Sequence, residues 1–191
     1  MIRVKHRANS IQDLAQISSE HGVEIDIRAN TTDLYISHDP FTPGCLLSDY
    51  LEAYKHELLI LNIKEDGLEE AVMDLLSEFD IRQYFFLDQP FPSLRRNLLL
   101  DRSCAARVSE YELLPVGLKP ISWIWLDSFN GNWDHLIPTI EFAEKNSIKT
   151  CLVSPELQGR QSKREIGDLK ALLNDYDKQI TAVCTKLIEE W

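Results

Sequence analysis

The chain has 191 residues, of which 44% are hydrophobic and 27% are charged, a composition typical of one ordinary globular domain. Its 31 acidic residues outnumber its 20 basic ones, and the formal net charge of -11 argues against a general nucleic-acid or anionic-membrane binder. No apolar run approaches the roughly 20 residues of a membrane span, and residues 1–6 lack the pattern of a signal peptide. We therefore expect a cytoplasmic protein whose four widely separated cysteines are buried free thiols.

A short apolar or β-branched run followed by a longer amphipathic stretch recurs along the chain. Several of these runs are apolar at successive positions, which is typical of strands covered on both faces in a parallel sheet. The predicted strands cover residues 2–6, 22–28, 58–64, 83–87, 104–108, 123–127, 150–154 and 180–184.

The stretches between these runs have helical periodicity. Ser10 is a suitable N-cap for a helix over residues 10–20, which His21 and Gly22 would end. Further helices are predicted at residues 67–79, 133–145 and 162–176 and around Leu51 and Tyr54, and residues 32–39 form a small extra extended element.

Eight consecutive strand–helix units predict a closed (β/α)8 barrel, although the chain is slightly shorter than the usual lower limit of about 200 residues. No linker or repeat divides it, so residues 1–191 are expected to be a single domain. The alternative is an open doubly wound sheet, which the lack of a glycine-rich phosphate loop disfavours. In a barrel, the functional residues lie at the carboxyl ends of the strands.

Charged residues are concentrated at these predicted strand ends. Glu24 and Asp26 are two apart on one strand, so their carboxylates face the same way and can converge on a hard cation. Alternatively, they lie on the solvated face of a half-exposed strand. His6 and Arg7 together offer a proton carrier and a fork for phosphate, while Lys64 either faces the barrel mouth or extends away from it.

These pieces occur in an order that resembles the glycerophosphodiester phosphodiesterase family and the wider group of phospholipase-C-like phosphodiesterases. The resemblance covers about the first third of the chain, and the strand–helix pattern extends it to the whole. The residues that carry it are His6-Arg7, Glu24-x-Asp26, His38-Asp39 after the extra extended element, and Lys64 at the end of the third strand.

The resemblance implies a (β/α)8 barrel in which His6 and His38 act as general acid and base. It also implies that Arg7 and Lys64 hold the phosphate, and that the acidic pair binds a divalent cation, Mg²⁺ or Ca²⁺. These residue types suit the chemistry, because a phosphodiester gathers negative charge in its transition state and needs proton transfer to its leaving group.

The chain departs from the family pattern at the third metal ligand. Asn62 stands where the family usually has a glutamate, so an uncharged amide oxygen would complete the site and metal affinity should fall. Glu156, or else Asp88 or Asp127, is a candidate for the missing carboxylate. The family's insertion after the second strand is also largely absent, and Lys186 replaces a common aspartate.

Later residues suggest that a phosphorylated or sugar-like ligand is bound at the same mouth. Arg107 and Arg160 are expected to face it and contact phosphate, although Arg160 is equally well a solvated loop cation. One of two tryptophans on the sixth strand forms an apolar wall beside the ligand, or both pack between barrel and helices; the residues concerned are Trp123, Trp125, Phe129 and Trp133.

The leading hypothesis is a phosphoric diester hydrolase. It would carry out metal-assisted hydrolysis of a small glycerol-, inositol- or sugar-type phosphodiester, with a histidine as acid and a histidine as base. One alternative is a catalytically weakened barrel that binds a sugar phosphate or diester without turnover. Another is an aldolase-like barrel in which Lys64 forms a Schiff base and no metal is needed.

Overall fold

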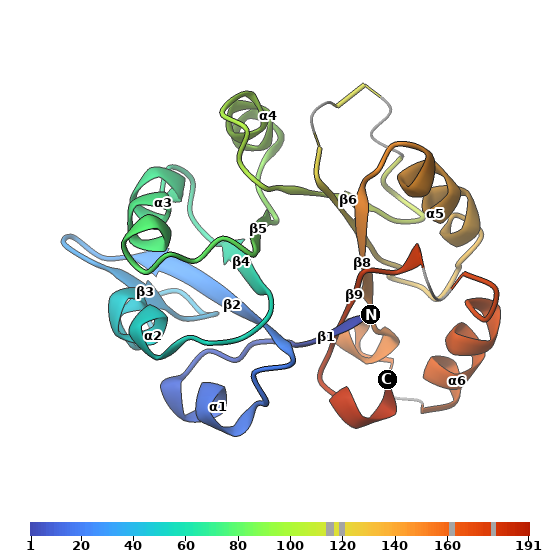
Figure 1. The fold of residues 1–191 in the computed structure, drawn as a ribbon, viewed down its shortest axis with the longest axis horizontal. Coiled ribbons are helices and arrows are strands. Elements are labelled where there is room, and N and C mark those ends of the chain that lie inside the picture. The colour runs from blue at the N-terminus through green and yellow to red at the C-terminus, as the bar shows by residue number, and fades with distance from the viewer. Residues whose placement is uncertain (114–116, 119–120, 161–162, 177–178) are drawn as a thin grey trace.

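The computed structural model describes residues 1–113, 117–118, 121–160, 163–176 and 179–191. Eight parallel strands form a nearly closed barrel (Figure 1), in the order β5-β4-β2-β1-β9-β8-β7-β6. Each predicted strand overlaps an observed one, and the predicted (β/α)8 architecture is confirmed. The barrel strands are β1 (Ile2–Lys5), β2 (Gly22–Ala29), β4 (Leu59–Ile63), β5 (Tyr84–Leu87), β6 (Ala105–Val108), β7 (Trp123–Leu126), β8 (Lys149–Val153) and β9 (Ala182–Thr185).

Helices surround the ring of strands, with α1 to α3 on one side in Figure 1 and α5 and α6 on the other. They are α1 (Ile11–Gln16), α2 (Leu47–Ala53), α3 (Glu69–Glu78), α4 (Phe91–Leu99), α5 (Leu136–Lys145) and α6 (Lys163–Leu172), with 3-10 turns η1 (Pro155–Gln158) and η3 (Ile188–Glu190). The last predicted helix begins at Ser162, which lies outside the described residues. None of the described helices is long and apolar enough to cross a membrane.

The first helix is shorter than predicted. Ser10 caps it, accepting a hydrogen bond from the Asp13 backbone N–H at 3.0 Å, but the chain becomes extended at Ile17. Gly22 therefore does not end this helix. Gly22 is the first residue of β2, and a Cβ atom at this position would lie 2.8 Å from the Leu58 carbonyl oxygen. The backbone of β2 can approach the start of β4 this closely because glycine has no side chain.

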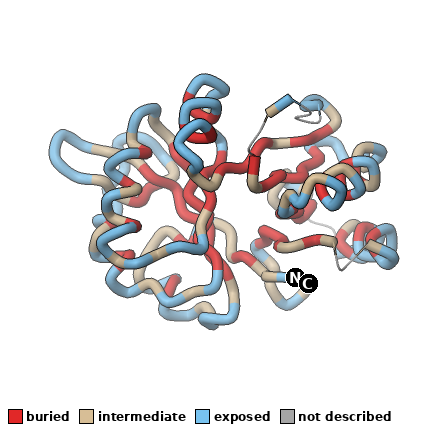
Figure 2. Tube along the Cα trace, turned by 45° about the horizontal axis from the view of Figure 1, so that its top comes forward, coloured by how far each residue is buried: buried red, intermediate tan, exposed pale blue. Residues whose placement is uncertain are grey.

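The residues of each strand divide between two apolar cores, because side chains alternate along a strand. One set points into the barrel, where Phe85 and Trp123 pack with ring centroids 4.6 Å apart. The other set packs against the surrounding helices, as Ile25 and Val23 do. Burial therefore follows the strands, and exposure follows the outer helical surfaces (Figure 2).

The junction of β5 and β6, here called the seam, has fewer backbone pairings than the other strand junctions of the barrel. Five residue pairs join β2 to β4, whereas a single bridge between Phe86 and Cys104 joins the seam. Contrary to the prediction of eight complete units, no helix occurs between β6 and β7 in the described part of residues 109–122. This segment contains Pro115, Gly117 and Pro120, which disfavour a continuous helix.

The four cysteines form no disulfide bonds with one another, as predicted. All four are free thiols, three of them buried and Cys45 half-buried. Burial raises the pKa of the Cys104 thiol to about 12, which keeps it protonated and unreactive at neutral pH.

Candidate functional site

Two carboxylates lie inside the barrel near the carboxyl end of β2. Glu24 and Asp26 are fully buried and alternate with Val23, Ile25 and Ile27, which face the helices. The predicted same-face pair is therefore inside the ring and not on a solvated outer face. Burial, together with the neighbouring Asp26, raises the pKa of Glu24, because two adjacent anions in a dry site oppose each other.

The β1–α1 turn supplies hydrogen bonds to both carboxylates. The Arg7 backbone N–H donates to Glu24 Oε2 at 2.8 Å, and Arg7 has a φ of 54°, a left-handed conformation that a tight turn requires. Asn9 holds Asp26 twice: its Nδ2 donates to Oδ2 at 2.8 Å, and its Oδ1 accepts from the Asp26 backbone N–H at 3.0 Å. The sequence analysis did not single out Asn9, although its place two residues after Arg7, just beyond a strand end, was a usable signal.

Lys64 points into the mouth, not away from it. Its Nζ lies 2.8 Å from Asp26 Oδ1, and the Arg7 Nε lies 3.8 Å from Oδ2 of the same carboxylate. The buried aspartate is thus flanked by two cations. Because the Lys64 Nζ is already paired with the Asp26 carboxylate, it is not a free amine available to attack a carbonyl carbon, and the aldolase-like alternative loses support.

His6 lies at the end of β1 beside the acidic pair. Its Nε2 is 3.8 Å from Glu24 Oε2, and its Nδ1 is buried with no hydrogen-bond partner among the described residues. Burial and the positive charges of Arg7 and Lys186 lower the pKa of His6 to about 3. The imidazole is therefore neutral at physiological pH and able to accept a proton.

The extra extended element carries His38 to the same rim. It forms β3 (Leu34–Ile36), antiparallel to β2, and Ser37 N donates to Asp26 O at 2.9 Å. Arg28 then secures the turn, with Nη2 donating to the His38 carbonyl at 2.9 Å. The predicted extra element is confirmed, while the clamping role of Arg28 was not foreseen.

The contacts of His38 define its tautomer. Its Nε2 lies 2.6 Å from Nη2 of Arg7, a group that can only donate, so Nε2 accepts. Its Nδ1 lies 2.8 Å from Asp39 Oδ1, which accepts the remaining ring proton. Asp39 therefore holds the Nδ1 side of the ring and is placed to stabilise the imidazolium when Nε2 carries a proton.

The donors expected for a divalent cation are only partly assembled. No three His, Cys, Asp or Glu side chains gather as a metal site within the described ranges. Asn62 is buried on β4 directly beside Asp26, and its Nδ2 donates to Glu24 Oε1 at 3.2 Å. Its Oδ1 is buried without a hydrogen-bond donor among the described residues. Two carboxylates and an unpartnered amide oxygen fit a hard cation of modest affinity.

Three other predicted residues are engaged elsewhere. Glu156 accepts from the Ser154 and Thr185 hydroxyls and from the Lys186 backbone N–H, and no hydrogen bond within the described part of the chain joins it to the acidic pair. Its η1 position therefore does not bring it together with Glu24.

Arg107 and Arg160 are also held by protein groups. Arg107 forms ion pairs with Asp88 and Asp127, has Glu112 at 3.8 Å and lies 5.5 Å from the Phe129 ring centroid. Arg160 donates to Glu165 at 2.8 Å and to the Ser128 carbonyl at 2.7 Å, so it is not a free cation in solvent.

The tryptophans of β7 face the barrel interior. Trp123 and Trp125 are buried there against Phe85, so they do not pack between the barrel and the helices, and a role beside a ligand stays a prediction. Trp133 instead stacks on His135 with ring centroids 6.0 Å apart.

The chain matches no protein-family model and no curated protein. Solved structures resemble it throughout. A glycerophosphodiester phosphodiesterase from Agrobacterium tumefaciens has a TM-score of 0.70 at 12% identity, over 100% of this chain and 97% of that one. A glycerophosphoryl diester phosphodiesterase from Parabacteroides distasonis has a TM-score of 0.69 at 12% identity, over 99% and 84%.

The same fold also occurs with other chemistry. A tryptophan synthase α-subunit from Pyrococcus furiosus has a TM-score of 0.57 at 11% identity, over 98% of this chain and 88% of that one. Because fold likeness at such identity does not transfer an activity, the function must be argued from the site. The chain has the (β/α)8 fold of solved glycerophosphodiester phosphodiesterases, the family that its strand-end motifs resemble.

Proposed function

We propose that this protein is a phosphoric diester hydrolase that cleaves a small glycerol-, inositol- or sugar-type phosphodiester with the help of a divalent cation. One observation carries the proposal: two histidines and two cations lie around a buried carboxylate pair at one barrel mouth. The geometry rests on His6, His38, Arg7 and Lys64. The similar solved structures include enzymes with this class of activity.

The two histidines differ in a way that divides the proton transfers between them. His6 has Glu24 Oε2 at 3.8 Å from its Nε2, a carboxylate that can stabilise the imidazolium formed when the ring takes the proton of an attacking hydroxyl. His38 is more exposed and has Asp39 on its Nδ1, which stabilises a protonated ring that can donate from Nε2. We therefore assign His6 as the base and His38 as the acid of the first step.

The first step is attack by a substrate hydroxyl next to the phosphate. His38 enters this step protonated at Nε2. A new O–P bond forms, the hydroxyl proton passes to His6, and the P–O bond to the leaving alcohol breaks as His38 gives its Nε2 proton to that alcohol. The product is a cyclic phosphate. Water then opens the ring with the two histidines in reversed roles, which yields a phosphate monoester and restores both protonation states.

Arg7 and Lys64 stabilise the charge that develops on the phosphoryl oxygens. Both already lie within 4 Å of Asp26, so a bound phosphate shares their charge with that carboxylate. Glu24, Asp26 and the Asn62 amide oxygen would hold the cation, which supplies further electrostatic stabilisation of the transition state.

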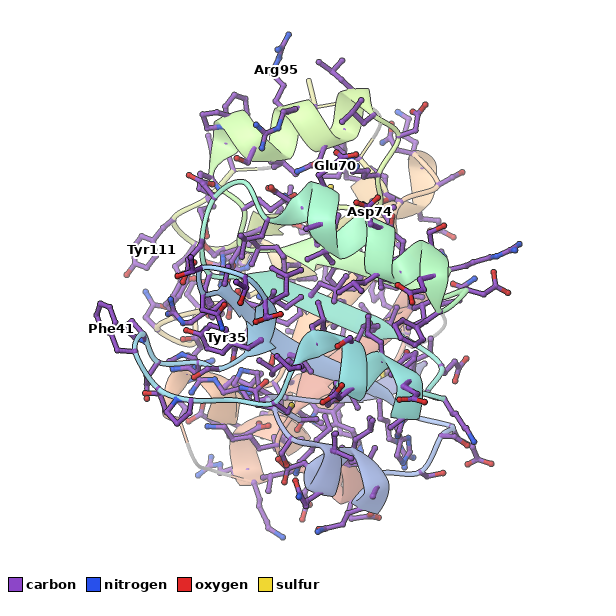
Figure 3. All side chains as sticks on the ribbon, turned by 90° about the vertical axis from the view of Figure 1, so that its left-hand side faces the viewer. Tyr35, Phe41, Glu70, Asp74, Arg95 and Tyr111 are labelled. Carbon is purple, nitrogen blue, oxygen red and sulfur yellow. The ribbon has the colours of Figure 1, made fainter. Side chains whose placement is uncertain are left out.

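The test is a screen of glycerol, inositol and sugar phosphodiesters with Mg²⁺, with Ca²⁺ and with a chelator. Hydrolysis is expected with at least one cation and is expected to disappear with the chelator. Asp26→Asn should abolish it, whereas Asp74→Asn, a charge change at a residue projecting from α3 (Figure 3), should not. No hydrolysis of any diester with either cation contradicts the proposal.

One observation favours a second candidate, a barrel that binds a diester without turnover. Asn62 replaces a charged ligand, and Arg107 is already neutralised by carboxylates. In that case binding of a diester would survive His6→Ala and His38→Ala unchanged, because binding alone does not require proton carriers.

A further inference from the structure

A cavity of about 800 Å³ lies along the seam between β5 and β6, and neither the acidic pair nor the two histidines line it. We call it the seam groove. Its lining is mostly apolar and comes from four segments, β5, α4, β6 and the β6–β7 connection. The residues used below are Leu87, Phe91, Leu94, Ala106, Leu113 and Leu118.

The groove exists because the barrel is incompletely covered at this point. One bridge joins the two strands, and the described part of the β6–β7 connection contains no helix to pack on β6. As a result, apolar side chains remain at the surface: Leu113 is 91% exposed and Phe91 is 64% exposed. Exposed apolar surface that lines a cavity is typical of a binding site.

The seam groove adjoins the candidate active site. Leu87 lines the groove and is the register partner of Asn62 on the neighbouring strand, and neighbouring strands are about 4.8 Å apart. Leu87 also belongs to the core inside the barrel, so the groove reaches the interior at β5, which β4 separates from the acidic pair on β2. A ligand anchored by its phosphate at Lys64 therefore has an apolar channel one strand away.

The polar end of the groove does not favour a second anion. Arg107 lines it together with Asp88 and Glu112, and both carboxylates neutralise the guanidinium. A neutral chain can pass these paired groups, whereas a free carboxylate or phosphate would meet excess negative charge. Tyr111, from the same connection, projects on the same side of the molecule as Phe41, which follows the His38 turn (Figure 3).

We propose that the seam groove binds the apolar chain of the substrate, so that the preferred diester carries an alkyl or acyl group and not only polar substituents. This inference rests on the proposed function, because the chain is placed by a phosphate held at the barrel mouth. The volume lies within the roughly 300 to 1,000 Å³ of small-molecule sites. Each buried methylene contributes about 0.8 kcal/mol, or roughly a fourfold change in affinity.

The experiment compares glycerol phosphodiesters that carry a methyl, butyl or octyl ester, each below its aggregation concentration. We expect kcat/KM to rise at least tenfold from methyl to octyl. Phe91→Glu and Leu113→Glu, at exposed positions where folding is not at risk, should each lower the octyl-to-methyl ratio at least fivefold. Leu99→Glu is the matched control, because Leu99 is on the same helix, is 65% exposed and does not line the groove.

The outcomes separate the two proposals. If the methyl diester is cleaved but chain length and the groove variants have no effect, the groove proposal is overturned and the hydrolase proposal stands. If no diester is cleaved, the hydrolase proposal fails, and equilibrium binding of the same diesters tests the groove proposal. That proposal is supported if the octyl diester binds at least tenfold more tightly than the methyl diester and Phe91→Glu, but not Leu99→Glu, weakens the binding of the octyl diester. Equal binding of the two diesters overturns the groove proposal. A dimer in sedimentation that Phe91→Glu dissociates would mean that a second copy occupies the groove, which also overturns it.

Discussion

The ion pair between Lys64 and Asp26 makes a strong prediction about stability. Asp26 is fully buried, and the Lys64 side chain is 19% exposed with its Nζ 2.8 Å from the carboxylate. Lys64→Met keeps the side-chain volume but removes the charge. Breaking a buried pair from one side typically costs about 3 to 5 kcal/mol. Because Lys64 is partly exposed and Arg7 remains 3.8 Å from the carboxylate, we expect the lower end, about 3 kcal/mol.

Urea denaturation at pH 7.5 with a chelator present measures this change in the free energy of unfolding. For a domain of this size, about 3 kcal/mol also corresponds to a fall in Tm of roughly 6 to 12 °C. Lys55→Met, at an exposed lysine, should stay within about 0.5 kcal/mol of the wild type.

A double-mutant cycle tests the cause. Adding Asp26→Asn to Lys64→Met removes both charges, so the double variant should be more stable than the sum of the single effects by about 2 kcal/mol. If the two substitutions are additive within about 0.5 kcal/mol, the pair is not coupled and the reasoning from burial is refuted.

Four further outcomes are expected. His6→Ala and His38→Ala should each lower turnover of a natural diester by about 10² to 10⁴; on a nitrophenyl diester only His38→Ala should recover, and recovery by the other variant would reverse the assignment. Asn62→Glu should weaken stability in chelator and tighten Mg²⁺ or Ca²⁺ binding in calorimetry, while unchanged affinity would mean that this position does not face the cation. Gly22→Ala should cost at least about 2 kcal/mol in urea denaturation, because its Cβ would lie 2.8 Å from a carbonyl oxygen, and a neutral result would contradict the strand contact. In native protein at pH 8, a thiol reagent should label Cys45 at most, against all four thiols in denaturant, since burial raises the pKa of the others; rapid labelling of several native thiols would contradict their burial.

The sequence alone predicted the barrel, because its signal is local and repeated. Consecutive apolar residues followed by helical periodicity recur along the chain, and each unit can be recognised without knowing its neighbours. The same locality placed the functional groups at strand ends. Glu24 and Asp26 had to share a face because side chains alternate on a strand, and the structure turns that face inward.

Helix limits and the completeness of the barrel depended on contacts that periodicity does not report. The first helix was predicted to run to residue 20, with Gly22 as its end signal, yet the chain is already extended at Ile17 and Gly22 serves the close strand contact with Leu58 instead. The missing cover over β6 could have been suspected from Pro115 and Pro120, but not the groove, which needs α4 on the opposite side.

The partners of the charged residues were decided only by the tertiary structure. Arg107, Arg160 and Glu156 have the right chemistry for phosphate or metal, but protein groups from distant segments occupy them. Conversely, Asn9 becomes important only because the turn brings it onto Asp26. Sequence determines which charges exist and which strand end carries them. Only the folded chain decides which charges neutralise one another, because electrostatic pairing depends on distances of a few ångströms between residues far apart in sequence.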